Sequence, residues 1–337
     1  MRPGNIPPVE LLTNLPVATS AGACFTSDLR GNGQYIYYFA PTAAAMAQFW
    51  RYDVFANTWQ QLASPGTFGG TARFVAGCAL QFDASASVPF GGAAGPNIWL
   101  FHPDSAAPWA EFQIYNIALN TWVNASQAGG AFTAGGLGAA ALAAQWTTDA
   151  AIVHPCTALD PAVSDDFIYL TGNAAVSFYR YAISTGTVAA MTNRGVLAGA
   201  GCTLAWIPAS HDRLYSQDGG ATNGWNTYTI VGNNWALGLA NPIPNTETYT
   251  TGTALIGDVA RDRFIVRKSA LAGEQIKLYD FIYNLPTPIL VPLSTAYQGE
   301  GTPHVGSLIG LSRVGSQKYV FLGKQTSTDF QRVWIVE

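Results

Sequence analysis

The chain has 337 residues and a net charge of −4, and charged residues make up only 11% of it, against about 25% in ordinary soluble domains. Its 16 lysine and arginine residues are scattered along the chain, so there is no basic stripe that would bind a phosphate backbone. No stretch reaches the ~18 apolar residues of a membrane span, and the first residues do not resemble a secretory signal. We therefore expect neither nucleic acid nor a membrane as a partner.

Low charge has a second implication. A surface made largely of Ala, Gly, Thr, Ser and Asn favours burial against neighbouring protein subunits, including copies of the same chain. The 35 glycines and 19 prolines supply the turns that an all-β chain needs.

An internal repeat dominates the sequence. The segment FWRYDVFANTW, Phe49 to Trp59, returns as FQIYNIALNTW, Phe112 to Trp122, with the Phe, the Tyr and the Asn-Thr-Trp in register. Weaker copies begin at Phe178, Trp225 and Ile276, and the chain ends in a truncated copy, QRVWIVE. The anchor residues of the six copies are Tyr52, Tyr115, Tyr181, Tyr228, Tyr279 and Trp334.

Apolar residues flank each anchor. The residue two positions later is apolar in all six copies, and the residue three positions earlier is apolar in five, with Gln331 as the exception. Apolar positions at a spacing of two are typical of a strand. Seven residues after the anchor, Trp59, Trp122, Val188 or Trp235 opens a further short strand after a turn, which predicts a hairpin.

Two more strand patterns precede each anchor, which gives four short strands per copy. Six such copies at intervals of roughly 50 to 65 residues predict one all-β domain, 1–337, folded as a six-bladed β-propeller with four-stranded blades. The predicted blades are 20–64, 72–126, 150–192, 200–239, 252–294 and 305–337. The last copy lacks a fourth strand, and we expect the N-terminal strand 8–16 to complete that blade and close the ring.

The repeat resembles the Kelch family. In the fourth copy, DRLYSQDGG from Asp212 to Gly220 is followed by Tyr228 and Trp235 at Kelch-like spacing. The resemblance covers nearly all of the chain and implies the propeller fold, although the other copies lack the Gly-Gly pair.

Four cysteines occupy what the alignment of copies treats as one slot of the innermost strand: Cys24, Cys78, Cys156 and Cys202. Equivalent positions on separate blades are not expected within the ~7 Å between Cα atoms that a disulfide allows. We expect small buried thiols.

Two histidines are candidate binding residues. His154 and His304 lie two positions before the cysteine slot in blades three and six, which face each other across a six-fold ring. They would contact a ligand from opposite sides of one channel mouth or respond to pH. The alternative is two unrelated loop histidines. Their separation and the absence of an HExxH motif or other ligand cluster predict no metal and no cofactor.

Long loops connect each blade to the next on one face of the predicted ring. The longest, Ser126 to Ala150, is apolar and rich in glycine, and its Phe132 and Trp146 are candidate contact residues. A flexible linker is the alternative.

No catalytic motif is present. SQDGGAT, Ser216 to Thr222, resembles the Asp-box of sialidases, which is a turn device, but it occurs once. Copper ligands at the spacing of galactose oxidase, another Kelch-like propeller, are also absent. We therefore predict that the chain is not an enzyme.

Two functions remain. The first is a structural component of a virion, such as a phage tail or nozzle, assembled in the host cytoplasm and held by other protein subunits. The alternative is a stand-alone, cytoplasmic Kelch-like module that binds protein or carbohydrate through the long-loop face.

Overall fold

The apolar residues that alternate around each anchor form β-strands, and the strands assemble into six four-stranded antiparallel sheets. The computed structural model describes residues 9–20, 22–28, 33–43, 46–66, 78–83, 95–103, 110–124, 150–153, 166–172, 176–185, 187–199, 202–207, 212–219, 224–237, 254–258, 263–268, 275–280, 289–291, 309–314, 317–323 and 328–335. Every regular element within these ranges is a strand, and none of them is a helix that could cross a membrane.

Each blade uses four strands in order from the centre of the ring outward. Blade 1 contains β2 (Cys24–Ser27), β3 (Tyr35–Ala43), β4 (Met46–Asp53) and β5 (Thr58–Gln61). Blade 2 contains β6 (Ala79–Asp83), β7 (Asn97–Pro103), β8 (Ala110–Asn116) and β9 (Thr121–Asn124). Blade 3 contains β10 (Ala150–Val153), β11 (Phe167–Gly172), β12 (Phe178–Ala182) and β13 (Thr187–Ala190).

The second half of the chain repeats this arrangement. Blade 4 contains β14 (Thr203–Ala205), β15 (Arg213–Gln217), β16 (Trp225–Thr229) and β17 (Asn234–Leu237). Blade 5 contains β18 (Ala254–Asp258), β19 (Arg263–Lys268), β20 (Gln275–Asp280) and β21 (Ile289–Val291). Blade 6 contains β22 (Ile309–Val314), β23 (Gln317–Gly323), β24 (Phe330–Ile335) and, from the other end of the chain, β1 (Val9–Leu11).

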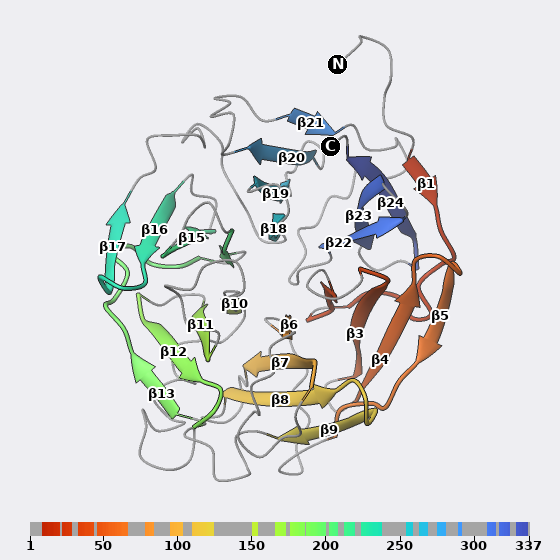
Figure 1. Cartoon of the computed structure of the whole chain (residues 1–337), viewed down its shortest axis with the longest axis horizontal. Helices are drawn as coiled ribbons and strands as arrows, with labels where there is room; N and C mark the ends of the chain where they lie inside the picture. Colours follow the sequence, from red (N-terminus) through yellow and green to blue (C-terminus); the bar gives the residue numbers. More distant parts are fainter. Residues whose placement is uncertain are drawn as a thin grey trace.

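The six sheets form a closed ring (Figure 1). The innermost strands touch one another in the order β2, β6, β10, β14, β18, β22 and back to β2. Strand β1 pairs with β24, with Val9 opposite Val333, so the N-terminal strand completes the last blade. The prediction of an all-β, six-bladed propeller closed in this way is confirmed.

The sixth copy of the repeat is shifted by one residue from the sequence alignment. Leu62 and Leu12 follow the outer strands of blades 1 and 6, and their N–H groups donate to the carbonyls of Phe49 and Phe330 respectively. Phe330 is therefore the equivalent of Phe49, and Val333 takes the anchor position instead of Trp334. Side chains alternate faces along a strand, so the shift replaces the exceptional Gln331 by an apolar residue, and the pattern holds.

A hydrogen-bonded clamp, absent from the expectations drawn from sequence, fastens three blades to the blade before them. In blade 4, the Asn233 side-chain oxygen accepts from the Tyr228 hydroxyl at 2.8 Å and from the Thr192 N–H at 2.9 Å, and Trp235 Nε1 donates to the Thr192 carbonyl at 2.9 Å. The ring of Phe178 from blade 3 packs against both Tyr228 and Trp235, with centroids 4.6 and 4.9 Å away.

The same clamp recurs with the same geometry at two other boundaries. Blade 2 holds Ala63 through Tyr115, Asn120 and Trp122. Blade 1 holds Thr13, which follows the N-terminal strand, through Tyr52, Asn57 and Trp59. Each clamp asparagine has a positive φ, between 48° and 54°, a conformation that asparagine tolerates better than most residues. The repeated Tyr, Asn and Trp are thus joints between blades.

The described cysteines are buried and free, as expected: Cys24, Cys78 and Cys202. Cys156 lies outside the described residues. The prediction that the cysteines occupy equivalent positions is wrong for Cys24. Cys24 pairs with Phe39, whereas the residue that pairs with the equivalent Phe101 is Ala79, one position after Cys78. Cys24 therefore faces blade 2, where it packs in one cluster with Cys78. Burial raises the pKa of the Cys24 thiol well above its usual value, which keeps it uncharged and unreactive.

Candidate functional site

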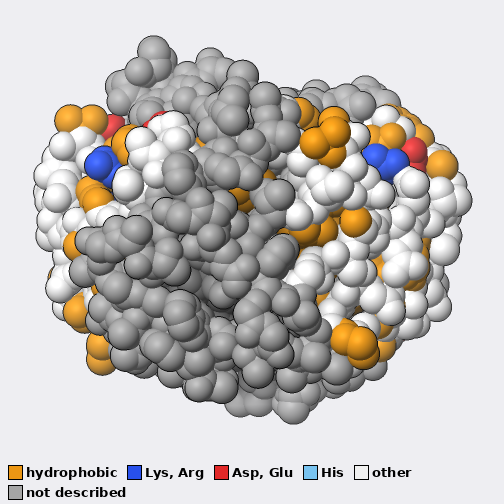
Figure 2. Space-filling view, turned by 90° about the horizontal axis from the view of Figure 1, so that it is seen from below, with side chains coloured by type: hydrophobic (Ala, Val, Ile, Leu, Met, Phe, Trp, Pro, Cys, Tyr) orange, Lys and Arg blue, Asp and Glu red, His pale blue; other side chains and the backbone are white. Residues whose placement is uncertain are grey.

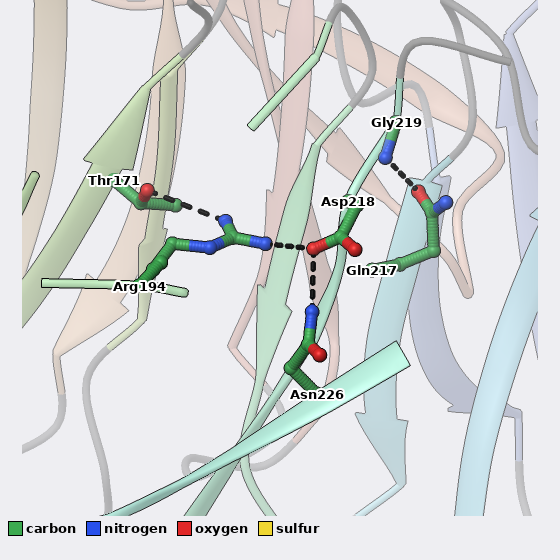
Figure 3. A network of polar contacts seen from close by, with 6 residues as sticks. All are labelled: Thr171, Arg194, Gln217, Asp218, Gly219 and Asn226. Carbon is green, nitrogen blue, oxygen red and sulfur yellow. Dashed lines mark hydrogen bonds and ion pairs between the residues drawn. The ribbon is translucent and has the colours of Figure 1, made fainter. Parts of the chain in front are cut away.

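A buried polar network lies at the boundary between blades 3 and 4 (Figure 3). It joins Thr171 at the end of β11, Arg194 in the linker after β13, and Asp218 and Asn226 on either side of the turn between β15 and β16. Because neighbouring strands run in opposite directions, these positions share the face of the ring that carries the linkers between blades. This is the face that the sequence assigns to binding.

The network replaces apolar packing found elsewhere in the ring. Thr171 lies three residues after Ile168, which pairs with the anchor Tyr181. The equivalent residues of blades 1 and 2 are the buried Phe39 and Phe101. The equivalent residues of blades 4 and 5, Gln217 and Arg267, are polar and buried as well, so this position changes from apolar to polar between blades 2 and 3.

Arg194 is the centre of the network. Its side chain is fully buried, and its backbone N–H donates to the Val176 carbonyl at 2.7 Å. One terminal nitrogen forms an ion pair with Asp218, and the other donates to the Thr171 hydroxyl at 3.4 Å. The guanidinium carbon lies 5.2 Å from the ring centroid of Trp235, within range of a cation–π interaction.

Asp218 is held from several sides. Its Oδ1 accepts from Asn226 Nδ2 at 2.6 Å in addition to Arg194. Its own N–H donates to the Gly224 carbonyl at 3.0 Å, and its carbonyl accepts from the Gly199 N–H at 2.6 Å. Burial raises the pKa of Asp218, and this outweighs the lowering by Arg194 and Asn226. The Asp218 carboxyl therefore lies next to the Arg194 guanidinium and is largely shielded from water.

A glycine makes room for this carboxylate. A Cβ atom on Gly224 would lie 1.9 Å from Asp218 Oδ2, far inside van der Waals contact. The turn between β15 and β16 therefore needs a residue without a side chain at this position for the network to form.

Buried polar atoms of this boundary that have no hydrogen-bond partner among the described residues include Arg194 Nε and Ser216 Oγ. Ser216 pairs with Asn226 across the sheet, so the two side chains share one face. Buried donors and hydroxyls without partners are rare in proteins, and here they leave hydrogen-bonding capacity beside the ion pair.

The site combines one ion pair with neutral hydroxyl and amide groups. The positive charge of Arg194 is balanced by Asp218, so the site has no net charge to attract an ion. Guanidinium, carboxylate, amide and hydroxyl groups can bind the donors and acceptors of a polyhydroxy ligand. Among the described residues no group of His, Cys, Asp or Glu could hold a metal ion.

The residues that the sequence proposed for binding are His154, His304, Phe132 and Trp146. All four lie outside the described residues, so their roles stay predictions. Sequence reasoning placed Asp218 in a turn motif but did not connect it with Arg194. The only available signal was an isolated arginine in a linker between blades, which by itself predicts nothing.

The chain is thus a six-bladed propeller with a buried polar network between two of its blades. Comparison with solved structures gives its relatives in fold. The chain is similar to the fucose-specific lectin of Aleuria aurantia, a six-bladed β-propeller, with a TM-score of 0.61 and 15% identity over 97% of this chain and 96% of the lectin. A mutant of that lectin in complex with Fucalpha1-6GlcNAc gives a TM-score of 0.60 and 14% identity over 96% and 94%.

A mercury-derivative structure of the same lectin matches with a TM-score of 0.60 and 15% identity, over 96% of this chain and 94% of the lectin. At such identities the likeness concerns the fold alone. No protein-family model and no curated protein sequence matches the chain. The resemblance to Kelch repeats therefore stays a prediction, while the propeller fold is established.

Proposed function

We propose that this protein is a carbohydrate-binding module that does not catalyse a reaction. The observation that carries the proposal is the similarity of almost the whole chain to a fucose-specific lectin with the same number of blades. It favours the binding-module alternative over the virion component that the sequence analysis placed first.

The network between blades 3 and 4 supports the same function. A neutral sugar offers hydroxyl groups that both donate and accept, and Arg194, Asp218 and Asn226 provide complementary groups within one small volume. The balanced charge of the pair favours a neutral sugar over an acidic one, because an anion would gain no net Coulomb attraction there.

The test is a binding measurement with a matched pair of variants. The purified protein is applied to an array of neutral and acidic glycans, and hits are titrated by calorimetry. Asp218→Asn should weaken binding of the best glycan at least about tenfold, the scale of one lost charge-assisted hydrogen bond. Asp258→Asn is the control, because Asp258 is also a buried carboxylate paired with a cation, Lys318, but at another boundary.

The two variants separate a loss of function from a loss of stability. Binding that survives Asp258→Asn and is lost in Asp218→Asn supports the site between blades 3 and 4. If Asp218→Asn bound the best glycan with unchanged affinity, the site between blades 3 and 4 would be rejected. An array without any hit would reject the carbohydrate proposal.

Assembly with other protein subunits, within or outside a virion, remains a second proposal. It is favoured by the scarcity of charge: on the face shown in Figure 2, the described side chains are mostly uncharged. Large apolar side chains are also exposed at the outer hairpin turns of three blades: Phe55, Leu119 and Val231. Light scattering on the purified chain tests it, and a monomer at high concentration would contradict it.

A further inference from the structure

The three clamps hold equivalent residues of the segments that follow the outer strands. These residues are Thr13, Ala63 and Thr192, and the residue before each of them donates its N–H to the phenylalanine carbonyl of the neighbouring strand. The residue two positions after the clamped one is buried in all three segments: Leu15, Pro65 and Arg194. Each clamp thus lies at a constant distance from a buried side chain.

Leu15 and Arg194 have the same place in the repeat. The N–H of Leu15 donates to the Thr328 carbonyl at 2.7 Å, and the N–H of Arg194 donates to the Val176 carbonyl, also at 2.7 Å. Both acceptors stand two residues before the phenylalanine that opens their strand. Leu15 packs into the apolar cluster between blades 6 and 1. Between blades 3 and 4, the same position carries a guanidinium into the boundary.

Arg194 is attached to both of the blades between which it lies. Its N–H bond to Val176 attaches it to blade 3, whereas the clamp on Thr192 attaches the same linker to blade 4. Asp218, its ion-pair partner, belongs to blade 4 (Figure 3). Because Thr192 is only two residues from Arg194, the clamp holds this part of the linker in register with the carboxylate.

Trp235 connects the clamp with the arginine directly. Its Nε1 donates to the Thr192 carbonyl at 2.9 Å, and its ring centroid lies 5.2 Å from the guanidinium carbon of Arg194. The equivalent Trp122 donates to a carbonyl at 2.7 Å in the clamp between blades 1 and 2. There the position of the arginine is taken by Pro65, which has no charge.

We propose that Asn233 and Trp235 are positioning residues of the binding site: they hold Arg194 against Asp218 and thereby set the affinity for the ligand. The inference rests on the proposed function, because that function assigns the ligand to this network. The equivalent clamp between blades 1 and 2 joins its blades without acting on the site.

The first experiment compares Asn233→Gly with Asn120→Gly. The two asparagines are closely matched, since each accepts from a tyrosine hydroxyl at 2.8 Å and from a backbone N–H at 2.9 Å, and glycine keeps the positive φ of both. Asn233→Gly should weaken binding of the best glycan at least about fivefold in calorimetry, because binding must then order Arg194. Asn120→Gly should stay within about twofold of the unaltered protein. Equal affinities of the two variants would overturn the proposal.

A conservative variant separates the hydrogen bond from the rest of the side chain. Asn233→Asp keeps an oxygen that accepts from Tyr228 and Thr192. It should bind the glycan more tightly than Asn233→Gly does. If aspartate weakened binding as much as glycine, the acceptor would not be what positions Arg194.

The second readout does not need a glycan. Arg194 lowers the pKa of Asp218 against the larger effect of burial, so displacement of the guanidinium should raise this pKa further. General loosening of the boundary would instead expose the carboxyl to water and lower its pKa. The side-chain carboxyl carbon of Asp218 is titrated by NMR and is assigned with Asp218→Asn.

We expect a higher pKa of Asp218 in Asn233→Gly than in the unaltered protein, and no change in Asn120→Gly. An unchanged or lowered pKa in Asn233→Gly would overturn the positioning role. This result is independent of the glycan array, so the proposed function and the present inference can fail separately.

Two tryptophan variants cover the case in which Asn233→Gly does not fold. Trp235→Phe and Trp122→Phe each retain an aromatic ring and remove one Nε1 donor. The pKa of Asp218 should rise in Trp235→Phe and stay constant in Trp122→Phe. The same pKa in both variants would overturn the proposal.

Discussion

The clamp asparagine makes a direct test of how the blades are joined. In Asn233→Gly the positive φ of 48° is kept without strain, but the Tyr228 hydroxyl and the Thr192 N–H lose their acceptor. Each lost hydrogen bond costs about 1 kcal/mol, and the turn is partly open to water, so the free energy of unfolding should fall by about 1–2 kcal/mol. Asn233→Ala adds about 1 kcal/mol because alanine is strained at positive φ.

The measurement is urea unfolding followed by tryptophan fluorescence, to which Trp235 contributes as one of the ten tryptophans. Asn234→Ala is the control, because Asn234 is the exposed neighbour in the same hairpin and accepts neither of these two bonds. It should change stability by less than about 0.5 kcal/mol. If Asn233→Gly and Asn234→Ala lowered the free energy of unfolding equally, the hydrogen bonds of the clamp would not contribute to stability.

Three further changes test other parts of the ring. Asp28 is buried, and burial raises its pKa from 3.8 to about 6, so the folded state binds its proton more tightly and stability falls as pH rises from about 4 to 6. Asp28→Asn should remove this loss, worth up to about 3 kcal/mol at pH 7. If the free energy of unfolding depended on pH in the same way in the variant and the unaltered protein, the prediction would be wrong. Lys318→Met leaves Asp258 buried without its cation and should cost about 3–5 kcal/mol by the same assay, whereas a cost below about 1 kcal/mol would show that water reaches the carboxylate. Gly224→Ala should displace Asp218 and abolish glycan binding in calorimetry, and unchanged affinity would show that the turn adjusts without the network.

The repeat carried most of the information about the fold. Tyr52, Tyr115 and Tyr228 each precede an apolar residue by two positions, and this spacing follows from the geometry of a strand. The missing fourth strand of the last copy predicted the pairing of the N-terminus with β24, because an unpaired edge is unfavourable. These predictions depend on local pattern and on counting.

The alignment of the six copies predicted the position of individual residues within the strands less accurately. The one-residue shift that replaces Trp334 by Val333 as the sixth anchor, and the shift of Cys24 relative to Cys78, both reverse the face on which a side chain lies. Sequence similarity between short degenerate copies does not resolve a shift of one residue. Cross-strand pairing does, because it is fixed by hydrogen bonds between neighbouring strands.

The sequence by itself determined that the chain is a ring of six similar sheets, since five sheets are encoded by contiguous residues and the sixth by the two ends of the chain. Only the tertiary structure showed that Arg194 meets Asp218 and that Asn57, Asn120 and Asn233 join blades. These contacts link residues from different blades, and no local pattern records them. Their energies depend on burial and geometry that exist only once the ring has closed.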